Sequence, residues 1–225
     1  MAISVDAISN GTNANTQTSS TWSHVVGSGP NRILCVICTA RDSSGTNDFV
    51  VSSVTFNGSG AGFSMITGLT DTSDRVRTEI WVLVNPTNTT ANIVVTWSGS
   101  CQTVAAGAIS LDGVDQSTPV HVSDTSQGTG TNPTISLTTT INNTFMVGGV
   151  MIDTSSDIIN DQGSAIFNLD GSRQAGGSYI ALPSSGVGTL SWTSSLSTGA
   201  WVANAISFKE FSLNTVRNLA LLGVG

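Results

Sequence analysis

Charge is the scarcest feature of this sequence. Only 9% of the 225 residues are Asp, Glu, Lys or Arg, the formal net charge is −7, and Lys209 is the single lysine. Because a nucleic-acid partner requires a concentrated basic surface, seven dispersed Lys and Arg residues argue against binding to DNA or RNA. The 39% of hydrophobic residues also distinguishes the chain from disordered proteins, which combine high charge with little apolar surface.

Targeting and membrane signals are also missing. The segment MAISVDAISN at residues 1–10 has neither the basic nor the apolar region of a secretory signal. The apolar segment at residues 212–225 is much shorter than the roughly 20 apolar residues of a membrane-spanning helix. We therefore expect a protein that is made in the cytoplasm and has no membrane partner.

Cysteine and histidine are few. Cys35 and Cys38 lie in RILCVICTA, a predicted strand on which positions i and i+3 face opposite sides, so they are not placed to form a disulfide or to share a metal. We expect both of them and Cys101 to be reduced and buried. The two histidines are His24, in a predicted strand, and His121, in a predicted loop.

Motifs of nucleophilic catalysis, phosphate binding and dinucleotide binding are absent from the sequence. A glycosidase needs two carboxylates in one cleft, but the only glutamates are Glu79 and Glu210, and Glu79 lies beside Arg77 on one strand face, which favours an ion pair. The Asp-rich segments starting at Asp71 and Asp153 do not match a calcium-binding loop, and such aspartates usually bond their own backbone. We therefore predict no enzyme, and no catalytic residue, cofactor or resident metal.

Strand-forming segments are abundant. Short stretches rich in Val, Ile, Thr and aromatic residues are bounded by Gly, Asn, Ser or Pro, which is typical of an all-β antiparallel sandwich or barrel. VAAGAISL at Val104 and FMVGGVMI at Phe145 are apolar on both faces, which predicts central strands covered on each side. We predict strands over residues 3–8, 20–26, 32–40, 50–57, 75–85, 91–97, 102–111, 134–139, 144–152, 164–168, 174–182, 187–193 and 200–209.

The sequence also contains an internal repeat. NRILCVICTARDSS at Asn31 aligns without gaps on NTFMVGGVMIDTSS at Asn143. Further blocks match in the same order: VTFNG with AIFNL, EIWVLVNP with SYIALPSS, VVTWS with TLSWT, and AGAISLD with ANAISFK. This conserved order predicts a β-sandwich over residues 1–211 that is built from two duplicated halves.

The halves should span about residues 1–116 and 117–211. Two arrangements are open. The halves either form one pseudo-symmetric sandwich or are two tandem immunoglobulin-like domains. The join retains apolar, strand-like residues at Val120 and Val122 and is not a clean linker, which favours one sandwich.

Several segments within residues 20–120 together resemble a known family. These segments are TWSHVVGSGPNRILCVICTA, VSSVTFNG, TEIWVLVNP, VVTWSG and AGAISLDGVDQSTPV. They resemble a diffuse family of Ser/Thr/Gly-rich β-sandwich proteins of tailed bacteriophages and environmental bacteria. The resemblance implies jelly-roll-like modules that serve as virion appendages, decoration proteins or surface adhesins, and it carries no catalytic residues. It does not extend beyond Phe211.

One strand offers a candidate binding surface. In RVRTEIWVLV the side chains of Arg77, Glu79 and Trp81 fall on one face, which we call the polar strand face. An aromatic ring beside charged hydrogen-bonding groups suits a saccharide, so these three residues are the candidate glycan site. The alternative is that a second element covers Trp81 as part of the core.

The segment SLNTVRNLALLGVG at residues 212–225 carries one charge. Asn214 is placed to cap a short helix over residues 215–222, but so short a helix is not stable alone in water. Its apolar side chains therefore need a surface, either on this sandwich or on a neighbouring subunit. The predicted assembly contacts are Val216, Leu219, Leu221 and Leu222.

Together these observations predict a non-catalytic structural protein of a bacteriophage virion, either a capsid decoration or a fibre-like appendage. Its expected partners are other virion subunits and further copies of itself, attached through the C-terminal segment. The alternative function is a carbohydrate-binding adhesin or receptor-binding module, with a surface glycan as partner. A hydrolase would require a His/Ser pair or a carboxylate pair to converge in the fold.

Overall fold

The computed structural model describes residues 2–11, 17–42, 49–73, 75–154, 157–169, 174–195 and 198–212. Within these ranges all regular structure is β-strand. The predicted assembly contacts Val216, Leu219, Leu221 and Leu222 lie outside the described residues. The strands are β1 (Ser4–Asn10), β2 (Gln17–Val26), β3 (Ile33–Arg41), β4 (Val51–Phe56), β5 (Phe63–Thr70), β6 (Val76–Val84), β7 (Thr89–Cys101), β8 (Thr103–Asp112), β9 (Val120–Gly130), β10 (Thr134–Thr139), β11 (Thr144–Ile152), β12 (Ile158–Gln162), β13 (Ser164–Leu169), β14 (Gln174–Leu182), β15 (Gly186–Ser194) and β16 (Gly199–Lys209).

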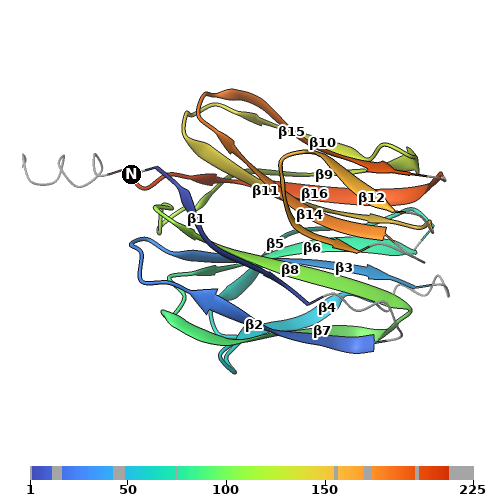
Figure 1. Ribbon diagram of the computed structural model, residues 1–225, viewed down its shortest axis with the longest axis horizontal. Coiled ribbons are helices and arrows are strands. Elements are labelled where there is room, and N and C mark those ends of the chain that lie inside the picture. Colours follow the sequence, from blue (N-terminus) through green and yellow to red (C-terminus); the bar gives the residue numbers. More distant parts are fainter. Residues whose placement is uncertain are drawn as a thin grey trace, which may run out of the picture.

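These strands form four antiparallel sheets. The first half of the chain gives a five-stranded sheet in the order β1-β8-β3-β6-β5 and a three-stranded sheet in the order β2-β7-β4. The second half gives β9-β16-β11-β14-β13 and β10-β15-β12, which is the same order with each strand number raised by eight. Figure 1 shows four stacked layers, with the two five-stranded sheets in the middle. The prediction of an all-β sandwich fold with two duplicated halves is confirmed.

Each half has a jelly-roll-like topology. β1 pairs with β8, β2 with β7 and β3 with β6, so the chain folds back on itself as a nested hairpin whose strands divide between two sheets. β5 departs from this pattern because it pairs with β6 at the edge of the five-stranded sheet. β13 takes the same place beside β14 in the second half.

The position of each layer explains the pattern of its strands. β2, in an outer layer, alternates between buried and exposed residues along most of its length, as a sheet with one solvated face requires. By contrast, every residue of β3 and β11 is buried, because the middle layers are covered on both faces. The same holds for nearly all of β8. The prediction of central strands at VAAGAISL and FMVGGVMI is therefore confirmed.

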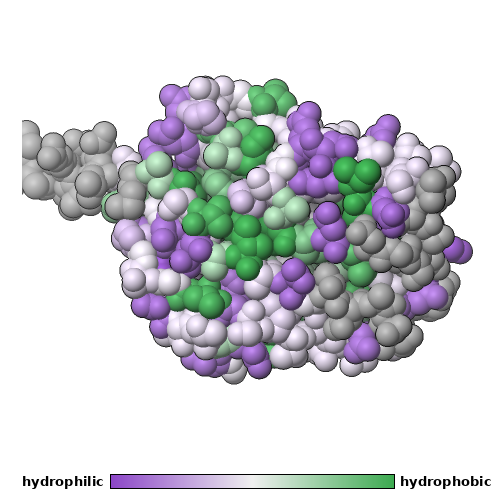
Figure 2. Space-filling model, viewed as in Figure 1, coloured by the Kyte–Doolittle hydropathy of each residue, from purple (hydrophilic) through white to green (hydrophobic). Residues whose placement is uncertain are grey.

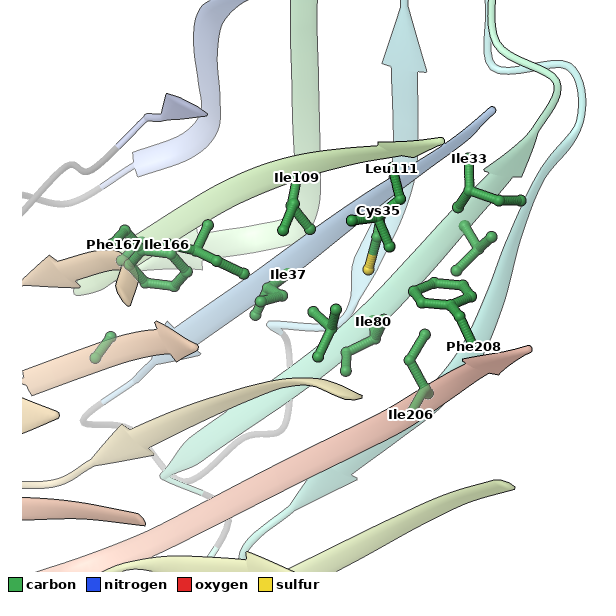
Figure 3. Close-up of a cluster of buried hydrophobic side chains, with 14 of the residues drawn as sticks. Ile33, Cys35, Ile37, Ile80, Ile109, Leu111, Ile166, Phe167, Ile206 and Phe208 are labelled. Atoms are coloured by element: carbon green, nitrogen blue, oxygen red, sulfur yellow. The ribbon is translucent and has the colours of Figure 1, made fainter. Parts of the chain in front are cut away.

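Three apolar clusters hold the layers together. One lies within each half, between its five-stranded and its three-stranded sheet, and these contain Trp97 and Trp192 respectively. The third lies between the two five-stranded sheets, where Ile37 and Ile80 of the first half meet Phe167, Ile206 and Phe208 of the second (Figure 3). Each half therefore has its own core, and the two halves also share one.

The two halves face each other with approximate twofold symmetry. β5 contacts β9 and β16, and reciprocally β13 contacts β1 and β8. Equivalent positions of the aligned strands β3 and β11 also meet. Ile37 packs on its counterpart Gly149, where a Cβ atom would overlap the Cγ2 methyl group of the isoleucine. Arg41 forms an ion pair with its counterpart Asp153, with Nε 2.6 Å from Oδ1. This reciprocity is that of a symmetric dimer interface within one chain.

The structure corrects two of the repeat matches. VTFNG lies in β4 and AIFNL in β13, but the counterpart of β4 is β12. EIWVLVNP and SYIALPSS lie in the equivalent strands β6 and β14, but in a different register. Cys38 pairs with Glu79, whereas its counterpart Val150 pairs with Gly176, so Glu79 corresponds to Gly176. A shift by two positions keeps each side chain on the same face, so the hydrophobic pattern alone does not detect it.

Candidate functional site

The polar strand face (Arg77, Glu79 and Trp81) lies on β6 and is turned towards the core of the first half. Glu79 is only 1% exposed. Its Oε1 accepts hydrogen bonds from Arg77 Nε at 2.6 Å and from the backbone N–H of Val51 at 2.9 Å. Its Oε2 accepts a hydrogen bond from Trp81 Nε1 at 2.8 Å. The three side chains are therefore brought together, but as a largely buried network.

This burial bears on the predicted glycan site. The Arg77–Glu79 ion pair that the sequence favoured is present, and the half-buried Trp81 packs against the apolar cluster of the first half. Because both carboxylate oxygens of Glu79 are bonded inside the protein, a sugar at this face would contact only Arg77 and Trp81. Glycan binding at the polar strand face stays a prediction.

His24 lies on β2 and is almost completely buried. Its Nδ1 lies 2.7 Å from the hydroxyl of Ser9, which itself accepts a hydrogen bond from Trp22 Nε1 at 2.9 Å. Burial lowers the pKa of His24 to about 4, although the charge of Asp6 opposes the shift. A histidine of such low pKa is a poor general base at neutral pH, so this convergent Ser/His pair does not favour a hydrolase.

The buried His24 should make the protein sensitive to acid. Between pH 6.5 and about pH 4 the unfolded chain binds a proton at this histidine that the folded chain does not, so the free energy of unfolding falls as the pH falls. The loss attributable to His24 should reach about 3 kcal/mol at the lower limit. Urea unfolding across this range should show a weaker pH dependence in His24→Asn than in the wild type. His121→Asn, the matched control, should keep the wild-type dependence, and an unchanged slope in His24→Asn would contradict the assignment.

The remaining histidine and the cysteines have structural roles. His121 lies near the start of β9 and not in a loop, and its Nε2 is 3.2 Å from both the backbone nitrogen and the hydroxyl of Thr140. The three cysteines are free and buried, as expected. Burial raises the pKa of all three thiols, that of Cys101 to about 12, so they are not reactive thiolates at neutral pH.

The Asp-rich segments are also engaged with the protein. Oδ1 of Asp71 accepts hydrogen bonds from the backbone N–H groups of Arg75 at 2.7 Å and Val76 at 2.8 Å. Although burial opposes ionisation, these and the bonds from Ser73 lower the pKa of Asp71. Asp153 pairs with Arg41. Among the described residues, no group of three His, Cys, Asp or Glu side chains could hold a metal ion, and no helix could span a membrane.

The structure contains a groove that the sequence did not single out. It lies between the β4–β5 loop and the β6–β7 loop of the first half and has a volume of about 280 Å³. We call it the loop groove. Its exposed polar residues are Asn57, Ser59, Asn85 and Thr87, and its apolar part includes Phe56, Leu83 and Pro86. None of the residues that line it is charged.

Two other hollows differ in their chemistry. One, of about 130 Å³, is largely apolar and lies between Ile3 near the start of the chain and Leu182 at the end of β14. The other, of about 290 Å³, lies between the halves, where Asp71 faces Gln127 of β9. Asp71 brings a negative charge to this second hollow, whereas the lining of the loop groove carries no charge.

Sequence signals for the loop groove exist but are weak. Asn57 precedes a glycine and Asn85 precedes a proline, and both dipeptides are typical of turns. The glycine-rich sequence GSGAGFS at residues 58–64 is typical of a loop, and its first five residues lie in the β4–β5 loop. Nothing in the sequence indicated that the two turns lie side by side, because β4 and β6 belong to different sheets of the sandwich.

The fold therefore defines an all-β protein of two similar, jelly-roll-like sandwich halves. No protein-family model matches the chain, and no curated protein matches its sequence. Among solved structures it is similar to a conserved protein of unknown function from Pseudomonas aeruginosa PAO1, at 8% identity and a TM-score of 0.26, with 91% of this chain and 90% of that chain covered. It is also similar to the mavirus major capsid protein, at 8% identity and a TM-score of 0.23, with coverages of 93% and 87%. TM-scores this low assign no function to this chain.

Proposed function

We propose that this chain is a non-catalytic structural protein of a bacteriophage virion, a capsid decoration or a fibre-like appendage, that is attached through residues 212–225. The observation that carries the proposal is the anchoring of the chain just before this segment. The backbone N–H of Phe211 donates to the carbonyl of Gly113 at 2.7 Å, and Glu210 forms a β-bridge with Val114. The apolar segment therefore starts from a fixed point, beside the connection between the two halves.

The surface of the body supports close packing between subunits. Most polar residues of the chain carry no charge, since only 9% of all residues are charged, and Figure 2 shows strongly hydrophilic residues scattered among neutral and apolar ones. Few charges would lose their hydration when such surfaces meet, which lowers the cost of association. Several exposed apolar side chains add to this surface, among them Val25, Met65, Ile159 and Val187.

Removal of residues 212–225 should abolish assembly without unfolding the body. Burial of each leucine or valine side chain of this segment against a partner contributes about 1.5–3 kcal/mol to the free energy of association, and the truncation removes this contribution. Sedimentation velocity should show that the full chain self-associates, whereas the truncated chain is monomeric with an unchanged melting temperature. A full-length variant with Leu219, Leu221 and Leu222 replaced by serine, the control for length, should behave like the truncation. A monomeric full chain, or a truncated chain that still associates, would contradict self-association through this segment.

A second candidate function is carbohydrate binding, as in an adhesin or receptor-binding module. The loop groove favours it, because the groove offers amide and hydroxyl groups and no charge. The two functions are compatible, because neither Phe211 nor Gly113, to which it is bonded, is among the residues that line the loop groove. Glycan recognition would then give a virion protein contact with a cell surface.

A further inference from the structure

We infer that the loop groove binds one ring of a neutral saccharide. This inference rests on the second candidate function, carbohydrate binding, and assigns it to specific residues. The first argument is chemical. An amide group both donates and accepts hydrogen bonds, as a sugar hydroxyl does, so Asn57 and Asn85 complement a polyol without any charge. The hydroxyls of Ser59 and Thr87 extend the same chemistry.

The polar groups of the groove are free to bind. Within the described part of the chain, the side chains of Asn57, Asn85 and Thr87 have no hydrogen-bond partner. All three residues are exposed, whereas Phe56 and Pro86 beneath them are buried. A sugar ring has apolar C–H faces as well as hydroxyls, so it suits a groove with an apolar base and polar edges.

The backbone of the groove is fixed, although its side chains are free. The N–H of Asn57 donates to the carbonyl of Asn92 at 3.1 Å, and the N–H of Asn85 donates to that of Arg32 at 2.9 Å. Arg32 Nε also donates to the carbonyl of Pro86 at 3.1 Å, so this guanidinium group stabilises the β6–β7 loop. Because the loops are ordered before a ligand arrives, binding costs less conformational entropy.

Both asparagines adopt a left-handed backbone conformation. The φ angle is 53° at Asn57 and 52° at Asn85, a region that favours glycine and, among other residues, asparagine. Glycine would satisfy this backbone requirement as well. Asn31 and Asn143, which do not line the groove, have the same conformation. An Asn→Gly change in the groove therefore removes the amide group and keeps the turn.

The groove belongs to the first half only. In the second half the counterparts of β4 and β5 are β12 and β13, and these are joined through the single residue Gly163. The wall formed by the β4–β5 loop has no equivalent there, so we expect one saccharide per chain. Its volume of about 280 Å³ is at the lower limit for small-molecule sites, which fits one sugar ring and not an extended chain.

The absence of charge among the lining residues selects the kind of sugar. An acidic or phosphorylated sugar would bring a negative charge to a groove without a cation to pair with it, in a protein whose net charge is −7. Neutral hexoses and their N-acetyl derivatives have no such cost. We therefore expect neutral sugars to bind and N-acetylneuraminic acid and glucose 6-phosphate to be rejected.

The test uses the full chain and a panel of single sugars. Saturation-transfer NMR and calorimetry with glucose, galactose, mannose, N-acetylglucosamine, N-acetylneuraminic acid and glucose 6-phosphate should identify at least one neutral ligand. The double variant Asn57→Gly/Asn85→Gly keeps the left-handed turns and should bind it at least about tenfold more weakly, because two hydrogen bonds are lost. The matched control Asn31→Gly has the same backbone conformation, with a φ of 56°, but lies outside the groove, and should keep wild-type affinity.

The outcomes separate the site from the function. If no neutral sugar binds the full chain, both this inference and the second candidate function are overturned. If a neutral sugar binds equally well to the wild type and to Asn57→Gly/Asn85→Gly, the loop groove is the wrong site although carbohydrate binding stands. Stronger binding of either charged sugar would overturn the assignment to neutral ligands. Melting temperatures of all variants show whether a loss of affinity comes from unfolding.

Discussion

Replacement of Asp153 by alanine should lower the free energy of unfolding by about 3–5 kcal/mol, because it leaves the charge of Arg41 buried without its partner. The side chain of Arg41 is only 5% exposed, and its Nε lies 2.6 Å from Oδ1 of Asp153. Removal of one member of a buried pair costs far more than the pair contributes. Urea unfolding with linear extrapolation measures the loss.

Two further variants test the cause of this loss. Arg75 also reaches Asp153, at 3.5 Å, but its side chain is 48% exposed, so Arg75→Ala should cost less than about 1 kcal/mol. The double variant Arg41→Met/Asp153→Leu removes both charges from the buried site and should recover most of the stability lost in Asp153→Ala. A double variant as unstable as the single one would show that shape, and not unpaired charge, causes the effect.

Replacement of Trp192 by alanine should cost about 3–5 kcal/mol, as large-to-small changes of buried aromatic residues do. Trp192 is completely buried in the core of the second half, and its Nε1 donates to the hydroxyl of Ser178 at 3.0 Å. The substitution loses both the packing and this bond. Chemical unfolding followed by tryptophan fluorescence and by circular dichroism measures the effect.

The first half contains the matched control. Trp97 occupies the equivalent position, is 3% exposed, and lies in the corresponding core. Trp97→Ala should therefore cost a similar amount. Because the two halves share the cluster between their five-stranded sheets, each variant should unfold in a single transition that both probes report together. A loss below about 1 kcal/mol in either variant would contradict the assignment of that residue to a core.

Much of the fold could be predicted from the sequence, because its strongest signals are local. Strands β8 and β11 are apolar on both faces, which predicted a layer covered on both sides, and their burial confirms this prediction. Three strands were not predicted, namely β5, β9 and β12. Each has a sheet neighbour on one side only, and β9 and β12 carry many polar residues, so neither shows the apolar alternation of a half-buried strand.

The site residues were harder to predict, because the hydrogen bonds and burial of a side chain depend on which other strands and loops the fold brings next to it. The pattern of alternation placed Arg77, Glu79 and Trp81 on one face correctly, but it could not reveal which sheet covers that face. The loop groove joins two turns whose strands are in different sheets, so no local pattern identifies it. The positions of Asn57 and Asn85 in turns could be predicted, but their proximity could not.

The pairs at the approximate twofold axis make the two halves specific for each other. A chain of two first halves would bring two isoleucines and two arginines together. The isoleucines would overlap, and the two buried positive charges would repel each other. A chain of two second halves would bring together two glycines and two aspartates, leaving a void beside a pair of like charges. Ile37 with Gly149 and Arg41 with Asp153 avoid both faults. The two copies of the duplicated unit are thus complementary at these positions. Two identical copies of either half would not pack against each other in this way.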